Sequence, residues 1–272
     1  MTLGYAIEMT RVDLSTWYNF TQSNQEDFAM THSIIFIFAI MLILLNACPA
    51  SAKQMDVQRG FVMKTIKVDD KTMNYVVYVP LSYDPTKPMP TIIFLNGAGE
   101  CGADGLKQCY HFGGAIMLDS QKWPFIVLFP QKQTTPVMWE DEEPMVMAIF
   151  EQAKKDYNID LSRLYLTGLS QGGHGTWAIA ARHPDLFAAI APVCGWADEE
   201  IAKKVARLPI WTFHGDNDKA VDVERSREME KWIKAAGGNC KLTIYPGVGH
   251  NSWDNAYRNE NLGDWFLQHK KQ

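Results

Sequence analysis

Ser170 is the residue of this sequence best placed to act as a nucleophile. It lies in the pentapeptide Gly168-Leu-Ser-Gln-Gly172, after the strand-like run Arg163–Thr167 and before Gly175–Arg182, whose small and apolar residues have helical spacing. A glycine-flanked serine between a strand and a helix sits in a strained turn that lifts its hydroxyl above the sheet, at the positive end of the helix. The pentapeptide alone is also typical of an ordinary small-residue turn. With these flanks it predicts a serine that attacks acyl carbon atoms.

The base and the acid that such a serine requires follow later in the chain. A serine hydroxyl needs a histidine to take its proton, and the histidine needs a carboxylate to orient it. His250 comes after the predicted strand Lys241–Tyr245, and Asp218 comes after the predicted strand Pro209–Phe213. Asp216 shares the acidic loop, but we expect it to cap its own turn. Four competing histidines, which lie in an early loop, on or near the helix after Ser170 or in the tail, are weaker candidates (His111, His174, His183 and His269).

The charge that develops on the attacked carbonyl oxygen requires backbone N–H donors. One donor comes from the residue after the nucleophile, here Gln171, and the other from the loop after the first central strand. That loop is the glycine-rich segment Asn96–Glu100, and we assign the second donor to Ala98. No Cys-x-x-Cys motif or histidine-rich spacing indicates a metal site, and no cofactor is expected.

The elements that must position these groups alternate between strand and helix from about Lys53 onward. Continuous apolar runs are typical of strands buried in a parallel sheet, and the alternating runs around Asp69–Lys71 predict a hairpin. We therefore expect one α/β domain over residues 53–272, with a mostly parallel central sheet, helices on both faces and an N-terminal antiparallel hairpin. The expected strands are Phe61–Val68, Thr72–Val79, Thr91–Leu95, Phe125–Phe129, Arg163–Thr167, Phe187–Val193, Pro209–Phe213 and Lys241–Tyr245, and the expected helices are Met145–Tyr157, Gly175–Arg182, Ile201–Ala206 and Val223–Ala236.

The residues before this domain are of a different kind. Ile34–Leu45 is an apolar run of about twelve residues, too short to span a bilayer but suited to the core of a signal peptide, and Ala50-Ser-Ala52 follows as a cleavage site. We expect residues 30–52 to be a signal peptide for secretion or export to the periplasm, and residues 1–29 to be an extension without a structural role. Leu45–Cys48 also resembles a lipoprotein box, so a lipid anchor on Cys48 is the alternative.

Charge and cysteine content restrict the partners and the compartment. The net charge of −5, with scattered basic residues, excludes a nucleic-acid partner. Export would place the domain in an oxidising compartment, where Cys101 and Cys109, which share one polar loop, could form a disulfide. Cys194 ends an apolar strand and is expected to be a buried thiol.

Several segments together resemble one known family. Besides the glycine loop, they are Tyr165–Gly173, Ala191–Gly195, Phe213–Val221 and Gly249–Trp253. They resemble the secreted carboxylesterase or "predicted peptidase" branch of the α/β-hydrolases, which is related to polyhydroxybutyrate-depolymerase-like and feruloyl-esterase-like serine esterases. The resemblance extends from about Asn74 to the C-terminus. It implies an α/β-hydrolase fold that cleaves carboxylic esters, with Ser170 as nucleophile, Asp218 as acid and His250 as base.

Two positions depart from the family pattern. Asn96 stands where a histidine is usual before the glycine, and Trp196 stands where a glycine is usual. The histidine generally has a supporting role, so its replacement leaves the expected activity in place. The larger Trp196 is expected to narrow the pocket.

The chain has little room for a lid over the site. Val193–Leu208 accommodates only one short helix, which favours an open site for short acyl, acetyl or hydroxycinnamoyl esters, on small molecules or on polysaccharide. Trp139, Trp196 and Trp253 are candidates for stacking on a sugar or feruloyl ring, together with the Tyr110–Phe112 cluster; a core role is an equally good interpretation for them. Trp177 is assigned to the core.

Two other functions compete with ester hydrolysis. A serine peptidase of the prolyl-oligopeptidase-like type would use the same three residues, but such enzymes usually carry an additional gating domain. An inactive binding protein on a hydrolase scaffold would have no use for a strained serine. Both interpretations are less favoured than a serine esterase.

Overall fold

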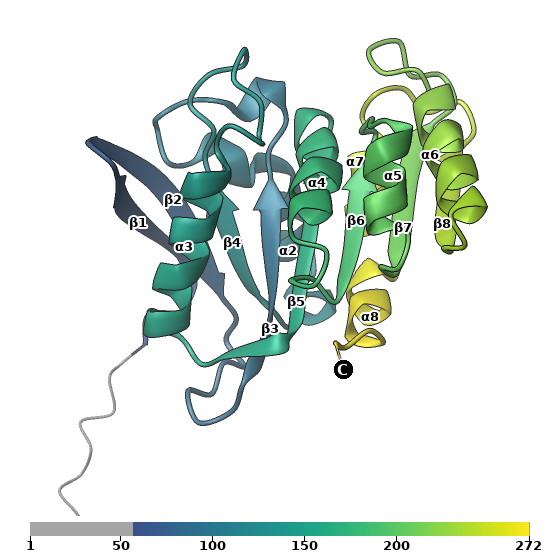
Figure 1. The fold of residues 1–272 in the computed structure, drawn as a ribbon. Coiled ribbons are helices and arrows are strands. Elements are labelled where there is room, and N and C mark those ends of the chain that lie inside the picture. Colours follow the sequence, from purple (N-terminus) through teal and green to yellow (C-terminus); the bar gives the residue numbers. More distant parts are fainter. Residues whose placement is uncertain (1–56, 272) are drawn as a thin grey trace, which may run out of the picture. The chain divides into compact units, whose positions relative to one another are not determined.

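The computed structural model describes residues 57–271, which form an eight-stranded sheet with helices on both faces (Figure 1). The predicted extension, the signal peptide and Cys48 lie outside the described residues. The strand order is β1-β2-β4-β3-β5-β6-β7-β8; β2 runs antiparallel to both of its neighbours, and all later pairs are parallel. The strands are β1 (Gly60–Val68), β2 (Lys71–Val79), β3 (Met89–Leu95), β4 (Ile126–Pro130), β5 (Ile159–Leu169), β6 (Ala189–Val193), β7 (Ile210–Gly215) and β8 (Cys240–Tyr245).

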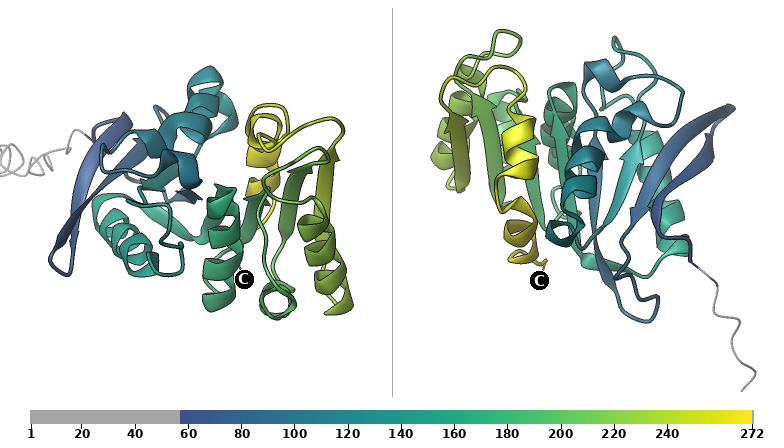
Figure 2. Two further views of the ribbon diagram at one scale, coloured as in Figure 1. Left: turned by 90° about the horizontal axis from the view of Figure 1, so that it is seen from above. Right: turned by 180° about the vertical axis from the view of Figure 1, so that it is seen from behind.

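The helices divide between the two faces of the sheet. Four of them, α3, α4, α5 and α6, cover one face, and α2, α7 and α8 cover the other (Figures 1 and 2). The helices are α2 (Tyr110–Leu118), α3 (Glu143–Asp156), α4 (Gln171–Arg182), α5 (Glu199–Val205), α6 (Glu224–Ala235), α7 (Trp253–Arg258) and α8 (Leu262–Leu267).

This arrangement creates two hydrophobic cores, one on each face of the sheet. In β3, Ile93 and Leu95 pack in the core under α3 to α6, whereas Ile92 and Phe94 pack in the core under α2, α7 and α8. Successive side chains of a strand point to opposite faces, so a strand covered on both sides must be apolar at nearly every position. The continuous apolar runs of the sequence are explained by this double burial.

The predicted mixed sheet, the N-terminal hairpin and the helices on both faces are confirmed. Every predicted strand is present; β5 begins at Ile159, four residues before the predicted start. Helices α2 and α8 were not predicted. Helix α2 contains Gly113 and Gly114 among apolar residues and therefore lacks an amphipathic period, whereas α8 has only six residues. His111 consequently lies on a helix rather than in a loop.

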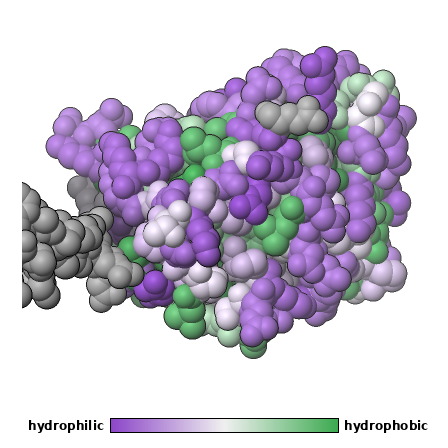
Figure 3. Space-filling model, turned by 90° about the horizontal axis from the view of Figure 1, so that it is seen from below, coloured by the Kyte–Doolittle hydropathy of each residue, from purple (hydrophilic) through white to green (hydrophobic). Residues whose placement is uncertain are grey.

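The connection between β6 and β7 contains one helix, α5, and the predicted absence of a lid domain is confirmed. Seen from below, the surface is mainly hydrophilic, with hydrophobic residues in small separate patches (Figure 3). Within residues 57–271, no helix is both long enough and apolar enough to cross a bilayer.

The turn between β5 and α4 is held by close backbone contacts. Ser170 has φ 55° and ψ −117°, a strained conformation for a residue with a side chain. A Cβ atom on Gly172 would fall on the carbonyl oxygen of Leu95, and one on Gly168 would collide with the carbonyl group of Gly172. A Cβ atom on Gly173 would meet the carbonyl oxygen of Val193. The first turn of α4 is therefore packed directly against the ends of β3 and β6.

We expect Gly172→Ala to lower the free energy of unfolding by on the order of 3–5 kcal/mol, or to prevent folding, because the colliding atoms are backbone atoms of a central strand that cannot move aside. Gly114→Ala is the matched control, since a Cβ atom there meets nothing within 4 Å and Gly114 lies inside helix α2. That variant should be stabilised by up to about 1 kcal/mol. Urea denaturation measures both, and a Gly172→Ala protein as stable as the wild type would contradict the packing described.

Candidate active site

Ser170, His250 and Asp218 meet at the C-terminal edge of the parallel strands. Ser170 follows β5, Asp218 follows β7, and His250 follows β8 just before α7. Nε2 of His250 lies 2.9 Å from Oγ of Ser170, and Nδ1 lies 2.7 Å from Oδ2 of Asp218. A neutral ring in this position carries its proton on Nδ1, and this N–H group donates a hydrogen bond to the carboxylate. Nε2 is then free to accept the serine proton. The arrangement can activate a serine hydroxyl.

The loops that carry Asp218 and His250 are joined by two hydrogen bonds. The Asn217 N–H donates to the Val248 carbonyl at 3.0 Å, and the Gly247 N–H donates to Oδ1 of Asp216 at 2.7 Å. The exposed Asp216 thus connects the two loops rather than capping its own turn, and its side chain has no bond to His250. These bonds fix the carboxylate of Asp218 relative to the imidazole.

Asp218 is held as an ionised acceptor. Its side chain is inaccessible to solvent, and Oδ1 accepts the N–H groups of Ala220 at 2.8 Å and Val221 at 3.0 Å. Burial acts to raise the pKa of this carboxyl, but the hydrogen bond from His250 and the two backbone N–H groups outweigh it, so the pKa lies below its ordinary value. A carboxylate in this state stabilises a positive charge on His250.

A second histidine, His214, lies behind the acid and was not singled out from the sequence. It is completely buried on β7, with Nε2 3.2 Å from Oδ2 of Asp218 and 3.0 Å from the Val221 carbonyl, and Nδ1 2.7 Å from Oγ of Ser226. Burial lowers the pKa of His214. A neutral ring that donates from Nε2 and accepts the Ser226 hydroxyl satisfies all of these contacts. The His-Gly pair before the acidic loop was the available sequence signal.

Both predicted oxyanion donors begin a helical turn. Ala98 is the first residue of the 3₁₀ turn Ala98–Glu100, and Gln171 is the first residue of α4. The N–H group at such a position has no acceptor within its own helix and is free to bind an anion. A Cβ atom on Gly97 would lie 2.7 Å from the Leu169 side chain, so the two turns pack against each other next to Ser170.

Trp139 does not lie at the rim of the site, contrary to the interpretation that it stacks on substrate. Its side chain is fully buried, and its Nε1 donates to the Asn96 carbonyl at 2.9 Å. A Cβ atom on Gly175 of α4 would collide with it, so Trp139 fills the space between that helix and the glycine loop. Asn96 is also buried, and its Nδ2 donates to the Gly97 carbonyl at 2.6 Å.

The other two tryptophans that the sequence suggested for substrate stacking, Trp196 and Trp253, are partly exposed and contact histidines close to Ser170. The ring of Trp253 lies 5.3 Å from the ring of His250 in an edge-on arrangement. Trp196 stacks on His174 of α4, with ring centroids 4.9 Å apart, and its carbonyl accepts from Nδ1 of that histidine. Of the Tyr110–Phe112 cluster, Tyr110 is exposed and Phe112 is buried in the core. Trp177 is buried, as predicted.

The surroundings of His174 favour the protonated form of its ring. Its Nε2 lies 2.9 Å from Oε1 of Glu140. Burial acts to lower the pKa of His174, but the hydrogen bonds to Glu140 and to the Trp196 carbonyl outweigh it, and the pKa is raised. The ion pair fixes the orientation of the ring on which Trp196 stacks.

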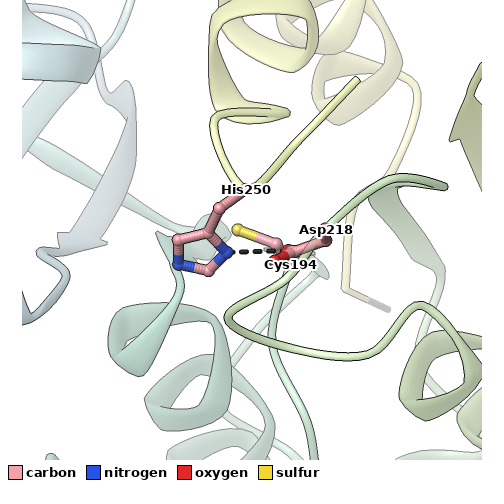
Figure 4. Close-up of side chains that lie close together, drawn as sticks. All are labelled: Cys194, Asp218 and His250. Atoms are coloured by element: carbon pink, nitrogen blue, oxygen red, sulfur yellow. Dashed lines mark hydrogen bonds and ion pairs between the residues drawn. The ribbon is translucent and has the colours of Figure 1, made fainter. Parts of the chain in front are cut away.

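Cys194 lies beside the acid and the base (Figure 4). Among the described residues, Cys194, Asp218 and His250 form one group whose donor atoms all lie within 4.8 Å of one another, a spacing that a metal ion could occupy. His250 and Asp218 already share their hydrogen bond, however, and burial raises the pKa of the Cys194 thiol to about 12. The group is therefore a hydrogen-bonded pair with a neutral thiol packed against it, as expected for a buried cysteine.

The four cysteines of the described residues are free thiols. The disulfide considered for Cys101 and Cys109 is not formed. Instead, Sγ of Cys101 lies 3.6 Å from the Gly97 carbonyl, within the glycine loop.

Comparison with known proteins agrees with the fold and with the resemblance found in the sequence. The model of the dienelactone hydrolase family matches residues 128–261, which include Ser170, Asp218 and His250. A bifunctional acetylxylan esterase/xylanase of Neocallimastix patriciarum is 30% identical over 58% of this chain, and the carboxylesterase SOBER1 of Arabidopsis thaliana is 27% identical over 51%. The chain spans only 23% and 63%, respectively, of the lengths of these two relatives.

Among solved structures, a thermostable esterase superimposes with a TM-score of 0.71 at 30% identity, over 77% of this chain and 63% of that one. Together with the sheet order and the position of the strained serine, this similarity confirms the α/β-hydrolase fold.

The position of Asp218 predicts a pH dependence of stability. The pKa of Asp218 in the folded protein lies below its ordinary value of 3.8. The ionised carboxylate therefore stabilises the fold at pH values above the pKa that Asp218 has in the unfolded chain, and this contribution is lost as the pH falls through the folded-state pKa. We expect the free energy of unfolding to fall more steeply between about pH 5 and pH 3 for the wild type than for Asp218→Asn. Denaturation at several pH values measures this, with Asp185→Asn as the control for removing one charge, because Asp185 is exposed and its side chain makes no hydrogen bond or ion pair within residues 57–271. Equal slopes for the wild type and Asp218→Asn would contradict the described bonding.

Proposed function

We propose that this chain, an α/β-hydrolase, is a serine esterase in which Ser170 is the nucleophile, His250 the general base and Asp218 the acid. The observation that carries the proposal is the unbroken hydrogen-bond chain from the strained Ser170 through His250 to Asp218. Backbone strain of this kind costs about 1–3 kcal/mol and persists where the surrounding structure enforces it, most often at functional sites.

The geometry supports the following sequence of steps. Nε2 of His250 takes the proton from Ser170 while Oγ attacks the ester carbonyl carbon, and the resulting oxyanion accepts the backbone N–H groups of Gln171 and Ala98. His250 then gives its proton to the leaving alcohol oxygen, and the acyl group stays on Ser170. A water molecule, deprotonated by His250, attacks the acyl-enzyme and releases the acid. Asp218 stays ionised and stabilises the imidazolium in both halves.

For the substrate, we infer short acyl or hydroxycinnamoyl esters, on small alcohols or on polysaccharide. The connection between β6 and β7 holds only the short helix α5, so it supplies no lid domain whose apolar surface could enclose a long acyl chain. The acetylxylan esterase/xylanase that resembles this chain supports the polysaccharide-linked class. In this proposal, the partly exposed rings of Trp196 and Trp253 are the side chains that contact the substrate.

An esterase is favoured over the two alternatives. The solved structure that is 30% identical to this chain is an esterase, and the two relatives compared above are named an acetylxylan esterase/xylanase and a carboxylesterase. An inactive scaffold is disfavoured because Ser170 keeps both its strained backbone and its bond to His250.

We further propose that residues 30–52 are a signal peptide and that residues 53–272 are the exported catalytic domain, with residues 1–29 as a non-structural extension. The support is the apolar run Ile34–Leu45 followed by Ala50-Ser-Ala52. A lipid anchor on Cys48 is the alternative form of export.

A fluorophosphonate probe tests the nucleophile. The wild type should be labelled covalently at Ser170, because His250 makes that hydroxyl reactive toward an electrophilic phosphorus atom. Ser170→Ala should lose the label and at least about 10⁴-fold of the kcat for p-nitrophenyl acetate. Ser252→Ala is the matched control, because Ser252 is a buried serine near the same loops. A folded wild-type protein that takes up no label would refute the proposed function.

The acyl preference is tested with p-nitrophenyl esters of increasing chain length. We expect kcat/KM to be highest for acetate or butyrate and at least about 10-fold lower for palmitate. Each added methylene group contributes little binding free energy where no apolar surface removes it from water. Release of acetate from acetylxylan and of ferulate from feruloyl esters distinguishes the two carrier-linked classes. A clear preference for palmitate would overturn the short-acyl assignment.

A further inference from the structure

Lys132 is a completely buried lysine that no step of the proposed mechanism uses. It lies two residues beyond the end of β4, at the start of the irregular segment 131–142. Four oxygen atoms surround its ammonium group: the carbonyls of Val137 at 2.5 Å, Thr134 at 3.2 Å and Thr135 at 3.3 Å, and Oε1 of Gln171 at 2.7 Å. An ammonium group removed from water is strongly destabilising unless it is fully hydrogen-bonded, and this one is.

The ammonium group connects the segment 131–142 to the residue after the nucleophile. The side chain of Gln171 is held at both ends, since Oε1 accepts from Lys132 and Nε2 donates to the Thr135 carbonyl at 3.3 Å. Gln171 is also the residue whose backbone N–H is the proposed first oxyanion donor. A side chain fixed at both ends restricts the peptide that carries that N–H.

The backbone of Lys132 bonds to the loop that carries Ala98, the other half of the proposed oxyanion site. Its N–H donates to Oδ1 of Asn96 at 3.4 Å, and its carbonyl accepts the N–H of Gly102 at 3.0 Å. Asn96 and Gly102 lie on either side of Ala98, the proposed second donor. The Thr135 hydroxyl adds a bond to the Ala98 carbonyl at 3.3 Å. Both halves of the site are therefore hydrogen-bonded to one residue.

We propose that Lys132 is a positioning residue that fixes the Gln171 and Ala98 backbone donors relative to each other and to Ser170, an inference that rests on the proposed esterase function. Segment 131–142 precedes α3 and has no regular strand partners, so the carbonyls of residues 134, 135 and 137 find their common donor in the Lys132 ammonium group. A methionine of similar length would fill the volume without supplying that donor. The positive charge of Lys132 thus orders the irregular segment 131–142 next to the backbone donors that must bind the oxyanion.

The rate of turnover depends on how accurately the two backbone donors are placed around the oxyanion of the transition state. Removal of one oxyanion donor typically costs about 10²–10³ in kcat, and a misplacement of about 1 Å costs on the order of 10². Ground-state binding of a small neutral ester depends much less on these donors. Loss of the Lys132 bonds should therefore lower kcat and leave KM nearly unchanged.

The test compares Lys132→Met with the wild type and with Lys204→Met, an exposed lysine on α5 that pairs with Glu200. We expect Lys132→Met to lower kcat for p-nitrophenyl acetate by about 10–100-fold with KM changed by less than about 3-fold. The affinity for a trifluoromethyl ketone, which forms a tetrahedral adduct with an oxyanion on the active serine, should fall by the same factor as kcat. Lys132→Arg, which keeps a cationic donor, should retain more kcat than the methionine variant.

Two measurements separate positioning from a general loss of folding. All rates are normalised to the fraction of Ser170 that a fluorophosphonate labels at completion. Gln171→Met keeps the three carbonyl partners of Lys132 and removes only the link to α4, so it should lower kcat as well, and the Lys132→Met and Gln171→Met effects should be less than additive in the double variant.

Failure of this inference is distinguishable from failure of the proposed function. A folded wild type without esterase activity or Ser170 labelling overturns the proposed function, and this inference with it. An active wild type whose normalised kcat is changed by Lys132→Met no more than by Lys204→Met overturns the positioning role alone. A rise in KM without loss of kcat, or full additivity with Gln171→Met, does the same.

Discussion

The structure depends on the close approach of the first turn of α4 to the carboxyl ends of two central strands. Gly172 and Gly173 have no side chain because the carbonyl oxygens of Leu95 and Val193 occupy the space where a Cβ atom would lie. This approach fixes the entry of the chain into α4 and forces Ser170 into its positive φ. The same contact places the start of α4 against the glycine loop, so the strained serine and the anion site are consequences of one packing constraint.

Around this constraint, the polar groups at the carboxyl edge of the sheet are arranged as a connected network. Asp218 accepts bonds from His250 and from two backbone N–H groups, and His214 lies behind it with all its ring contacts satisfied. On the other side of Ser170, the buried ammonium group of Lys132 has four oxygen partners. Buried charges are tolerated only when they are paired or fully hydrogen-bonded, and a network of this kind holds its members in one geometry.

The two cores explain how this network is supported. Because β3 and β5 are covered on both faces, the edge from which the site loops emerge is anchored by apolar packing above and below the sheet. The irregular segment 131–142 lies over that edge and is fixed by side chains rather than by strand pairing: Trp139 is buried against α4, and Glu140 pairs with His174. The loops therefore hold a defined position without regular secondary structure of their own.

The sequence by itself determined the fold class, the strand order along the chain and the three residues that meet at the sheet edge. These features depend on local information: apolar runs mark the buried strands, glycines mark the sharp turn at Ser170, and Asp218 and His250 directly follow their strands. The tertiary structure decided which polar and aromatic residues become partners. Trp139 is a candidate rim residue in the sequence but fills the interior, and Lys132 and His214 gain their roles from contacts with residues 39 and 12 positions away, respectively. Helix α2 was missed for the same reason, because its glycines and apolar residues are stabilised by burial under the sheet and not by a helical pattern of their own. Such pairings depend on how distant segments pack, which local spacing does not encode.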